Sequence, residues 1–186
     1  MKKIIAVFAA LLLLAAFVSC KNNKPSPTPA PADNGGYKAL LDNCVELAAN
    51  YSRELAEKCI PSGMIEKQVA VNKEQGRDFW ELLKAQFDDQ RALYAETYGD
   101  DWKITYTVIE AVEKDAAGIE NYKQFDAHYF ETYGIDTSKI SAVTFAKVNM
   151  HIEGSRDSND KEKTIQCFCI DGNWYSFYAV MMGLRL

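Results

Sequence analysis

The sequence predicts an α+β fold in which a mostly antiparallel sheet packs against helices. Three observations lead to this prediction. Apolar residues recur with the helical period of 3.6 in three segments, and after residue 101 other segments alternate with the strand period of two. An Asp-Gly pair at 171–172, typical of a tight hairpin, joins the last two alternating segments. The predicted order is therefore helix, helix, strand, helix, strand, strand, strand.

Two amphipathic helices are expected at the start of the domain. Residues 37–60 place their apolar side chains on one stripe, and a Pro-Ser-Gly sequence ends the pattern. A second helix is clearest over 77–98, with Gly99 in the position of a C-terminal cap. Gln90 falls within the apolar stripe of this second helix. There it can reach a polar group in a pocket, or bond to the backbone as a core residue.

The remaining elements follow from changes in period. Residues 102–108 alternate apolar and polar side chains, as a half-buried strand does. A third helix over about 119–133 is predicted to end at Gly134 and to bury one stripe. The stripe consists of Tyr122, Phe125, Tyr129 and Tyr133. The last three predicted strands are 140–153, 163–170 and 173–184.

The first 19 residues are typical of a bacterial signal peptide. Lys2 and Lys3 give a positive start, and residues 4–18 are uncharged and almost wholly aliphatic. This run is shorter than the roughly 20 residues that a membrane-spanning helix needs. We therefore expect residues 1–19 to be removed on export.

The segment Phe-Val-Ser-Cys at 17–20 resembles the lipobox of bacterial lipoproteins. A branched and then a small residue precede Cys20, while Phe17 stands where leucine is usual. The resemblance implies that the Cys20 thiol receives a diacylglycerol and that Cys20 becomes the new N-terminus. The protein would then be anchored in the cell membrane on its extracytoplasmic face. The alternative is an ordinary cleaved signal with a chance cysteine.

Residues 20–36 are expected to form a flexible linker between the lipid and a folded domain. The part after Cys20 contains four of the five prolines of the chain and no large apolar side chain. Such a segment cannot bury enough surface to offset the entropy lost on ordering. A single α+β domain is therefore expected over 37–186.

The charge of the chain limits its partners. The formal net charge is −5, and removal of Lys2 and Lys3 makes the chain more negative still. An acidic chain without a basic cluster binds nucleic acid poorly and is not attracted to anionic lipid headgroups. We therefore expect no nucleic-acid partner, and attachment to the membrane only through Cys20.

Three short segments carry a second resemblance. They are Tyr-Gly-Asp-Asp-Trp at 98–102, Ile-Glu-Gly-Ser at 152–155 and Ile-Asp-Gly-Asn-Trp-Tyr at 170–175. With the order of elements, they resemble small lipoproteins of clostridia-like bacteria with a cystatin-like or nuclear-transport-factor-2-like (NTF2-like) domain. The resemblance implies a curved sheet wrapped around helices to form a cone with an apolar pocket. Since that fold serves enzymes and binding modules alike, it implies no function.

Few side chains are placed to carry chemistry. Asp126 borders the stripe of the third helix, and an acid buried among tyrosines can act as a general base. Isomerases of the resembled fold use such an acid beside a tyrosine in an apolar cone. The alternative is a boundary residue that turns toward water. Asp126 is therefore the candidate catalytic residue, and the candidate ligand-binding residues are Gln90, Tyr122 and Tyr129.

The two histidines are expected at the surface without a catalytic partner. His128 falls outside the stripe of the third helix, and Asp126 is two positions away, where helical residues do not face each other. His151 lies on the polar side of its strand.

The cysteines after Cys20 are expected to be free and buried. If residues 37–60 are one helix, its rise separates Cys44 from Cys59 by about 22 Å, which is beyond disulfide reach. A bridge from Cys44 to Cys167 is the alternative, since export permits oxidation. Cys167 and Cys169 have no further ligand pair or spaced histidine, so no metal or cofactor is expected.

Three functions remain open. The first, which we favour because catalytic pairs are scarce, is a non-enzymatic module that binds a small apolar ligand or an envelope protein. The second is a ketosteroid-isomerase-like or dehydratase-like enzyme that uses a buried acid and a tyrosine. The third is a structural envelope protein whose cone is filled by its own side chains.

Overall fold

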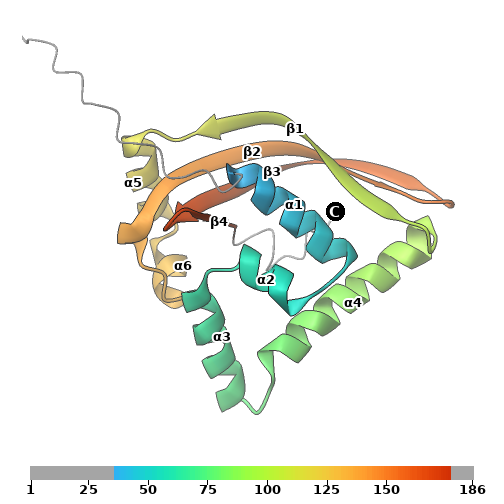
Figure 1. The fold of residues 1–186 in the computed structure, drawn as a ribbon, viewed down its shortest axis with the longest axis horizontal. Helices are drawn as coiled ribbons and strands as arrows, with labels where there is room; N and C mark the ends of the chain where they lie inside the picture. The colour runs from blue at the N-terminus through green and yellow to red at the C-terminus, as the bar shows by residue number, and fades with distance from the viewer. Residues whose placement is uncertain (1–35, 177–186) are drawn as a thin grey trace, which may run out of the picture. The chain divides into compact units, whose positions relative to one another are not determined.

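A computed structural model describes residues 36–176 of the chain. They form an α+β domain with a four-stranded antiparallel sheet in the order β1-β2-β3-β4 (Figure 1), which confirms the predicted class. The predicted signal peptide, Cys20 and nearly all of the linker lie outside the described residues. So do residues 177–184 of the last predicted strand.

The first predicted helix is in fact two helices, α1 (Gly36–Ala49) and α2 (Arg53–Cys59). The prediction of one helix was wrong because Ser52 starts a new one. Its backbone is extended, and its Oγ accepts a hydrogen bond from the Leu55 N–H over 3.1 Å, as an N-cap does. The apolar stripe continues across this break, so periodicity alone did not reveal it.

The next two helices are joined by a tight turn. The prediction of a helix near 77–98 is confirmed by α4 (Phe79–Tyr98), which Asp78 caps by accepting from the Trp80 N–H over 2.7 Å. Gly99 ends it with φ +106°, a region that favours glycine. An additional helix, α3 (Ser62–Glu74), precedes it. Only two residues of α3 are buried, so its stripe is weak.

The predicted third helix is also broken. It consists of α5 (Ala116–Phe125) and α6 (Ala127–Thr132), which meet at Asp126. A short 3-10 turn, η1 (Thr137–Lys139), then leads into the sheet.

The strands match the predicted positions, with different ends. The first, β1 (Lys103–Glu113), extends beyond residue 108 through a bulge, and β2 (Ile140–Glu153) has the predicted bounds. The third, β3 (Ser158–Ile170), begins five residues earlier than predicted, so β2 and β3 form a long hairpin. The Asp-Gly turn connects it to β4 (Asn173–Tyr175), with positive φ at both turn residues.

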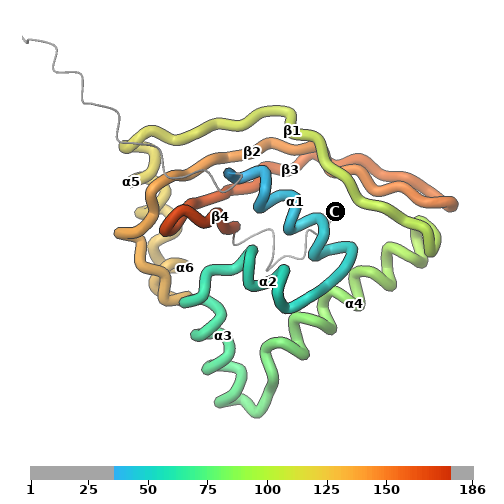
Figure 2. Tube along the Cα trace, viewed as in Figure 1, coloured from blue at the N-terminus to red at the C-terminus, as the bar shows by residue number. Residues whose placement is uncertain are grey.

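Helices lie on both faces of this sheet. On one face α1 crosses the strands (Figures 1 and 2), and the Tyr106 hydroxyl of β1 donates to Asp42 Oδ1 over 2.7 Å. On the other face the α5–α6 pair supplies Tyr122 and Phe130, whose rings contact Phe168 of β3 at 6.3 and 5.7 Å between centroids. Thr144 and Phe145 are neighbours on β2, so their side chains point to opposite faces.

The space between α1 and the sheet is filled by side chains. Ala146, Val148 and Ile152 of β2 and Cys167 of β3 have no exposed surface. Within residues 36–176, no helix combines the length and the apolar character needed to cross a membrane.

Candidate functional site

The candidate acid Asp126 occupies the junction between α5 and α6. Its backbone N–H donates to the Tyr122 carbonyl oxygen over 3.0 Å, and its own carbonyl oxygen accepts from the Phe130 N–H over 3.0 Å. The whole residue is only 2% exposed. Its carboxyl group therefore lies inside the domain instead of turning toward water.

The partner of this carboxyl is Tyr122, four residues earlier in the chain. The Tyr122 side chain lies close enough to the Asp126 carboxyl to lower its pKa through hydrogen bonding. The tyrosine ring is buried against Phe130 and Phe145, with centroids 5.6 and 5.9 Å away. The structure thus brings together two of the residues that the sequence singled out, in aromatic surroundings.

Burial raises the pKa of the Asp126 carboxyl above its ordinary value, while the hydrogen bond with Tyr122 acts in the opposite direction. Asp126 Oδ2 has no hydrogen-bond partner among residues 36–176. Gln166 Oε1 on β3 also lacks a hydrogen-bond partner among these residues. Gln166 is paired in register with Phe145, whose ring contacts that of Tyr122. A carboxyl of this kind is easier to protonate than a solvated one, as a general acid or base requires.

Catalysis by this pair would require access for a substrate. A general acid or base has to come within hydrogen-bond reach of the group that it protonates or deprotonates. None of the three pockets described below is lined by Asp126 or Tyr122. The pair has the chemistry of a proton-transfer site, but these three pockets do not lead to it.

Gln90 belongs to the core of α4. Its Nε2 donates to the Tyr94 hydroxyl over 2.6 Å, and both side chains are buried. The Tyr94 ring in turn contacts Tyr98 and Trp102, with centroids 6.0 and 5.2 Å away. Gln90 therefore satisfies a buried tyrosine instead of the backbone group that the sequence suggested.

The α5–α6 junction also exposes aromatic side chains. Phe125 is 82% exposed and Tyr129 is 49% exposed, although the predicted stripe buried both. The prediction was wrong because α5 ends at Phe125, and because the break at Asp126 changes the phase of α6, so that Phe130 is buried instead of Tyr129. We call Phe125, His128 and Tyr129 the α5–α6 aromatic patch, since His128 is also exposed and its ring lies 6.0 Å from that of Tyr129.

The second histidine belongs to a polar network on the strands. His151 Nδ1 lies 3.1 Å from Asp160 Oδ1, and Asn149 Nδ2 donates to the same oxygen over 2.8 Å. Asp160 and the nearby Glu153 raise the pKa of His151. The network is open to solvent, and His151 is paired in register with Asp160 across β2 and β3. We therefore interpret it as a set of cross-strand polar pairs on the surface of the sheet.

The cysteine geometry differs from the prediction. The four described cysteines are unbridged and buried. However, the predicted separation of Cys44 from Cys59 was wrong, because the break after α1 folds α2 back against α1 and brings the two thiols close enough to interact. Residues 36–176 contain no cluster of three or more histidine, cysteine or acidic side chains that could hold a metal ion.

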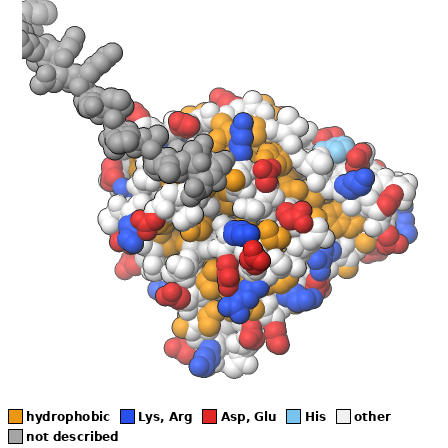
Figure 3. All heavy atoms as spheres, in the orientation of Figure 1, with side chains coloured by type: hydrophobic (Ala, Val, Ile, Leu, Met, Phe, Trp, Pro, Cys, Tyr) orange, Lys and Arg blue, Asp and Glu red, His pale blue; other side chains and the backbone are white. Residues whose placement is uncertain are grey.

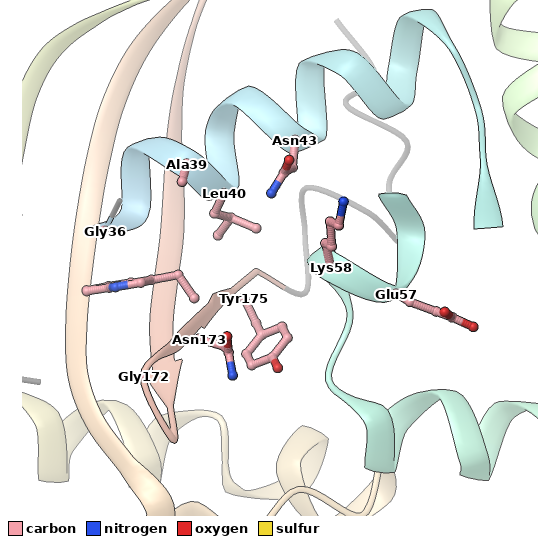
Figure 4. Close-up of a pocket in the computed structure, with 10 residues that line it drawn as sticks. Gly36, Ala39, Leu40, Asn43, Glu57, Lys58, Gly172, Asn173 and Tyr175 are labelled. Carbon is pink, nitrogen blue, oxygen red and sulfur yellow. The ribbon is translucent and has the colours of Figure 1, made fainter. Parts of the chain in front are cut away.

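A shallow pocket of about 290 Å³ lies between α1, α2 and β4 (Figure 4). Asn43 points toward it from α1 and Lys58 from α2, while Glu57 points away. Glu57 instead accepts a hydrogen bond from Arg53 Nε over 2.9 Å. No pattern in the sequence predicted this pocket, because it depends on the break in the first predicted helix. Its volume is at the lower limit of about 300 Å³ for small-molecule sites.

Two larger hollows have volumes of about 360 and 380 Å³. The first lies where the start of α3 meets the end of α6, and a Cβ added to Gly63 would lie only 2.9 Å from the Gly134 carbonyl oxygen. The second lies at the turn between α3 and α4, beside Val69 and Trp80. Neither contains a residue that the sequence singled out.

The surface has no dominant charge on the side that Figure 3 shows, where acidic and basic side chains are mixed among apolar ones. No protein-family model, curated protein or solved structure matches the chain. The residues themselves are therefore the basis for any functional proposal.

Proposed function

We propose that this protein is a lipoprotein of the bacterial cell envelope whose folded domain is a non-enzymatic protein-interaction module. The leader supports the first half of the proposal: Lys2 and Lys3, an apolar run, and the lipobox-like residues that end at Cys20. The lipid on Cys20 would hold the domain at the extracytoplasmic face of the cell membrane. The Pro-rich segment after it would act as a spacer.

The observation that carries the interaction role is the exposure of the α5–α6 aromatic patch. Phe125, at 82% exposed, leaves a large apolar ring in water, and Tyr129, at the start of the next helix, leaves a second ring 49% exposed. Aromatic side chains are enriched at protein–protein interfaces, where burying them supplies much of the binding energy. A partner that covers this patch would remove that apolar surface from water.

A protein partner fits the domain better than a small apolar ligand. The interior between α1 and the sheet is filled by side chains that have no exposed surface, including Val148 and Ile152. The cystatin-like or NTF2-like cone therefore stays a proposal for the curvature of the sheet, and described side chains fill the part of its interior beneath α1. The pocket of Figure 4 is small and polar at its mouth.

The membrane anchor is tested by mass spectrometry of the N-terminal peptide from the full chain expressed in a bacterial host. We expect peptides that begin at Cys20 and carry a diacylglycerol. Cys20→Ser should remain unprocessed, whereas Cys169→Ser, as the matched control, should be lipidated normally. An intact leader, or cleavage without lipid, contradicts the anchor.

The interaction role is tested by placing a photo-crosslinking amino acid at position 125 in cells that make the protein naturally. Position 93 is the matched control, because Leu93 is also an exposed apolar residue, on α4, with 57% of its surface accessible. We expect one dominant cross-linked protein at position 125, lost in Tyr129→Ala. Equal labelling from both positions, or none, would favour the structural envelope role.

An enzymatic function is the second candidate, and the Asp126–Tyr122 pair is the observation that favours it. Burial, a raised pKa and a tyrosine donor are the features of a ketosteroid-isomerase-like or dehydratase-like site. The test is proton exchange at the carbon next to a ketone in a panel of cyclic ketones, followed by NMR in deuterated water. Exchange that is lost in Asp126→Asn and weakened in Tyr122→Phe supports the enzyme, and no exchange with the wild type rejects it.

A further inference from the structure

Two thiols that lie 15 positions apart in the sequence meet in the interior of the domain. Cys44 is on the buried side of α1, and Cys59 is the last residue of α2. Their exposed fractions are 2% and 0%. Because residues 50–52 break the helix, α2 returns along α1 and packs against it, and the two thiols come close enough for Cys59 to affect Cys44.

The other two cysteines are placed differently. Cys167 on β3 is close enough to Cys44 to affect it electrostatically. Its thiol, however, donates to the Ile165 carbonyl oxygen of the same strand over 3.9 Å. Cys169 lies two residues further along β3 and is paired in register with Trp174 of β4. Cys59, and not Cys167, is therefore the cysteine that affects Cys44 most strongly.

We propose that Cys44 and Cys59 form a disulfide that joins α1 to α2 in the exported protein. Cys44 and Cys59 are buried in the same core on two helices that pack against each other, so small side-chain movements bring them to bonding distance. A helix 37–60 without a break could not be bridged. The proposal rests on the proposed export of the chain, because disulfides persist in oxidising compartments and are rare in the cytosol.

The bond forms by two thiol–disulfide exchanges with a disulfide-carrying oxidant, such as an envelope thiol oxidoreductase or oxidised glutathione. One cysteine thiolate attacks the oxidant and gives a mixed disulfide, and the second cysteine thiolate then displaces the reduced oxidant. The oxidant gains two electrons and the two protons that the cysteines lose. The Cys44–Cys59 bond is the only new bond left on the protein.

The buried position of the pair determines when this reaction occurs. The hydrogen bond with Cys59 and burial both raise the pKa of the Cys44 thiol. The reactive thiolate is therefore scarce in the folded domain, and an oxidant cannot reach it. The disulfide must form while the chain folds after export, or when α2 opens locally.

The bridge would hold α2 at one of its few anchors. Only Ala56 and Cys59 of this seven-residue helix are buried. Closing a loop of about 15 residues lowers the entropy of the unfolded chain as a typical structural disulfide does, and this stabilises the folded domain. For a domain of this size, we expect reduction to lower the Tm by about 6–12 °C.

The test uses the full chain, exported in a bacterial host. The cells are quenched with acid, and the free thiols of the protein are then alkylated under denaturing conditions. Peptide mapping should find Cys44 linked to Cys59, with Cys167 and Cys169 alkylated. Four alkylated cysteines on a chain with lipidated Cys20 overturn the proposal. A Cys44–Cys167 link also overturns it.

Failure of export is a separate outcome, seen as an intact leader without lipid on Cys20. In that case the purified full chain is unfolded and refolded in a glutathione buffer at the redox potential of an oxidising compartment. The same Cys44–Cys59 link is expected there, and its absence overturns the proposal.

Variants distinguish the bridge from ordinary core packing. Cys59→Ala creates a cavity and lowers stability, but its Tm should no longer respond to reductant. Cys169→Ala is the matched control, since it also removes a buried thiol yet should keep the full response to reductant. A response to reductant in Cys59→Ala that equals the wild-type response contradicts the proposed pairing.

Discussion

The Tyr106 hydroxyl donates a hydrogen bond to Asp42 Oδ1 over 2.7 Å, and this contact links β1 to α1. Partial burial and the neighbouring carboxylate raise the pKa of Tyr106 well above its ordinary value of 10.0. Near pH 10, where a tyrosine of the unfolded chain begins to ionise, Tyr106 therefore stays neutral in the folded domain. The contact gives β1, at the edge of the sheet, a tether to the helix that crosses it.

Tyr106→Phe should lower the free energy of unfolding by about 1 kcal/mol, because it removes one hydrogen bond to a charged acceptor at a partly exposed site. The sign of the pH effect follows from the raised pKa. Below pH 10 the contribution is complete, and it is lost as the pH rises above 10, where the unfolded tyrosine ionises first. Urea unfolding at pH 7 and above pH 10 measures both effects. Tyr129→Phe, on a half-exposed side chain, is the control and should change neither.

The stability of the Asp126→Asn variant, relative to that of the wild type, should increase as the pH rises. The raised pKa of Asp126 means that the folded state holds its proton where the unfolded state has lost it. Wild-type stability therefore declines as the pH rises from about 4, and the decline stops above the folded-state pKa. Unfolding midpoints in urea between pH 4 and pH 8 measure the difference between the two proteins.

Asp136→Asn provides the control of opposite sign. Hydrogen bonds from Ser138 lower the pKa of Asp136, so its contribution is present above the ordinary pKa of 3.8 and is lost as the pH falls. A pH-independent difference between Asp126→Asn and the wild type would mean that the Asp126 carboxyl is solvated, and would remove the support for the enzymatic candidate.

Much of the fold follows from local patterns in the sequence. The bounds of β2 were predicted because apolar residues alternate along its whole length and face α1. The helix α4 was predicted because its apolar residues recur with the helical period and Gly99 marks its end. In these elements, periodicity and end signals agree.

The breaks at Ser52 and Asp126 are the points at which sequence reasoning failed. In each case a short polar residue interrupts a helix while the apolar period continues on both sides. The contact of Tyr122 with Asp126 could be anticipated from their spacing of four, which survives at the end of α5. The Cys44–Cys59 contact and the exposure of Phe125 could not, because both depend on where the chain turns at a break.

Ser52→Ala tests whether the first break is held by its N-cap. The substitution removes the hydrogen bond from the Leu55 N–H to Ser52 Oγ, and should cost about 1 kcal/mol of stability. Ser52→Asp retains an acceptor at the helix N-terminus and should restore most of that loss. Thermal unfolding measures both variants, and we expect Ser52→Ala to lower the Tm by about 2–4 °C. Equal Tm values for the alanine and aspartate variants would show that the cap does not define the break.

Gly154→Ala should be strongly destabilising, because the turn between β2 and β3 passes directly over the end of α4. A Cβ at position 154 would lie only 2.2 Å from the Tyr98 carbonyl oxygen, which also accepts a hydrogen bond from the Arg156 N–H over 2.9 Å. The added Cβ and the Tyr98 carbonyl oxygen are both fixed to the backbone. The clash is therefore relieved only if the hairpin moves away from α4. We expect a loss of about 1–3 kcal/mol, as for other overpacked sites.

Gly76→Ala is the matched comparison for this steric effect. Its φ of +68° strains any side chain, but a Cβ there would meet nothing within 4 Å. It should therefore cost about 1 kcal/mol from backbone strain alone. Urea unfolding of the two variants separates the contributions: if Gly154→Ala is no more destabilising than Gly76→Ala, the hairpin is not packed against the end of α4. A larger loss in Gly154→Ala, with faster solvent exchange of the Arg156 amide, shows that this contact holds the β2–β3 hairpin against the end of α4.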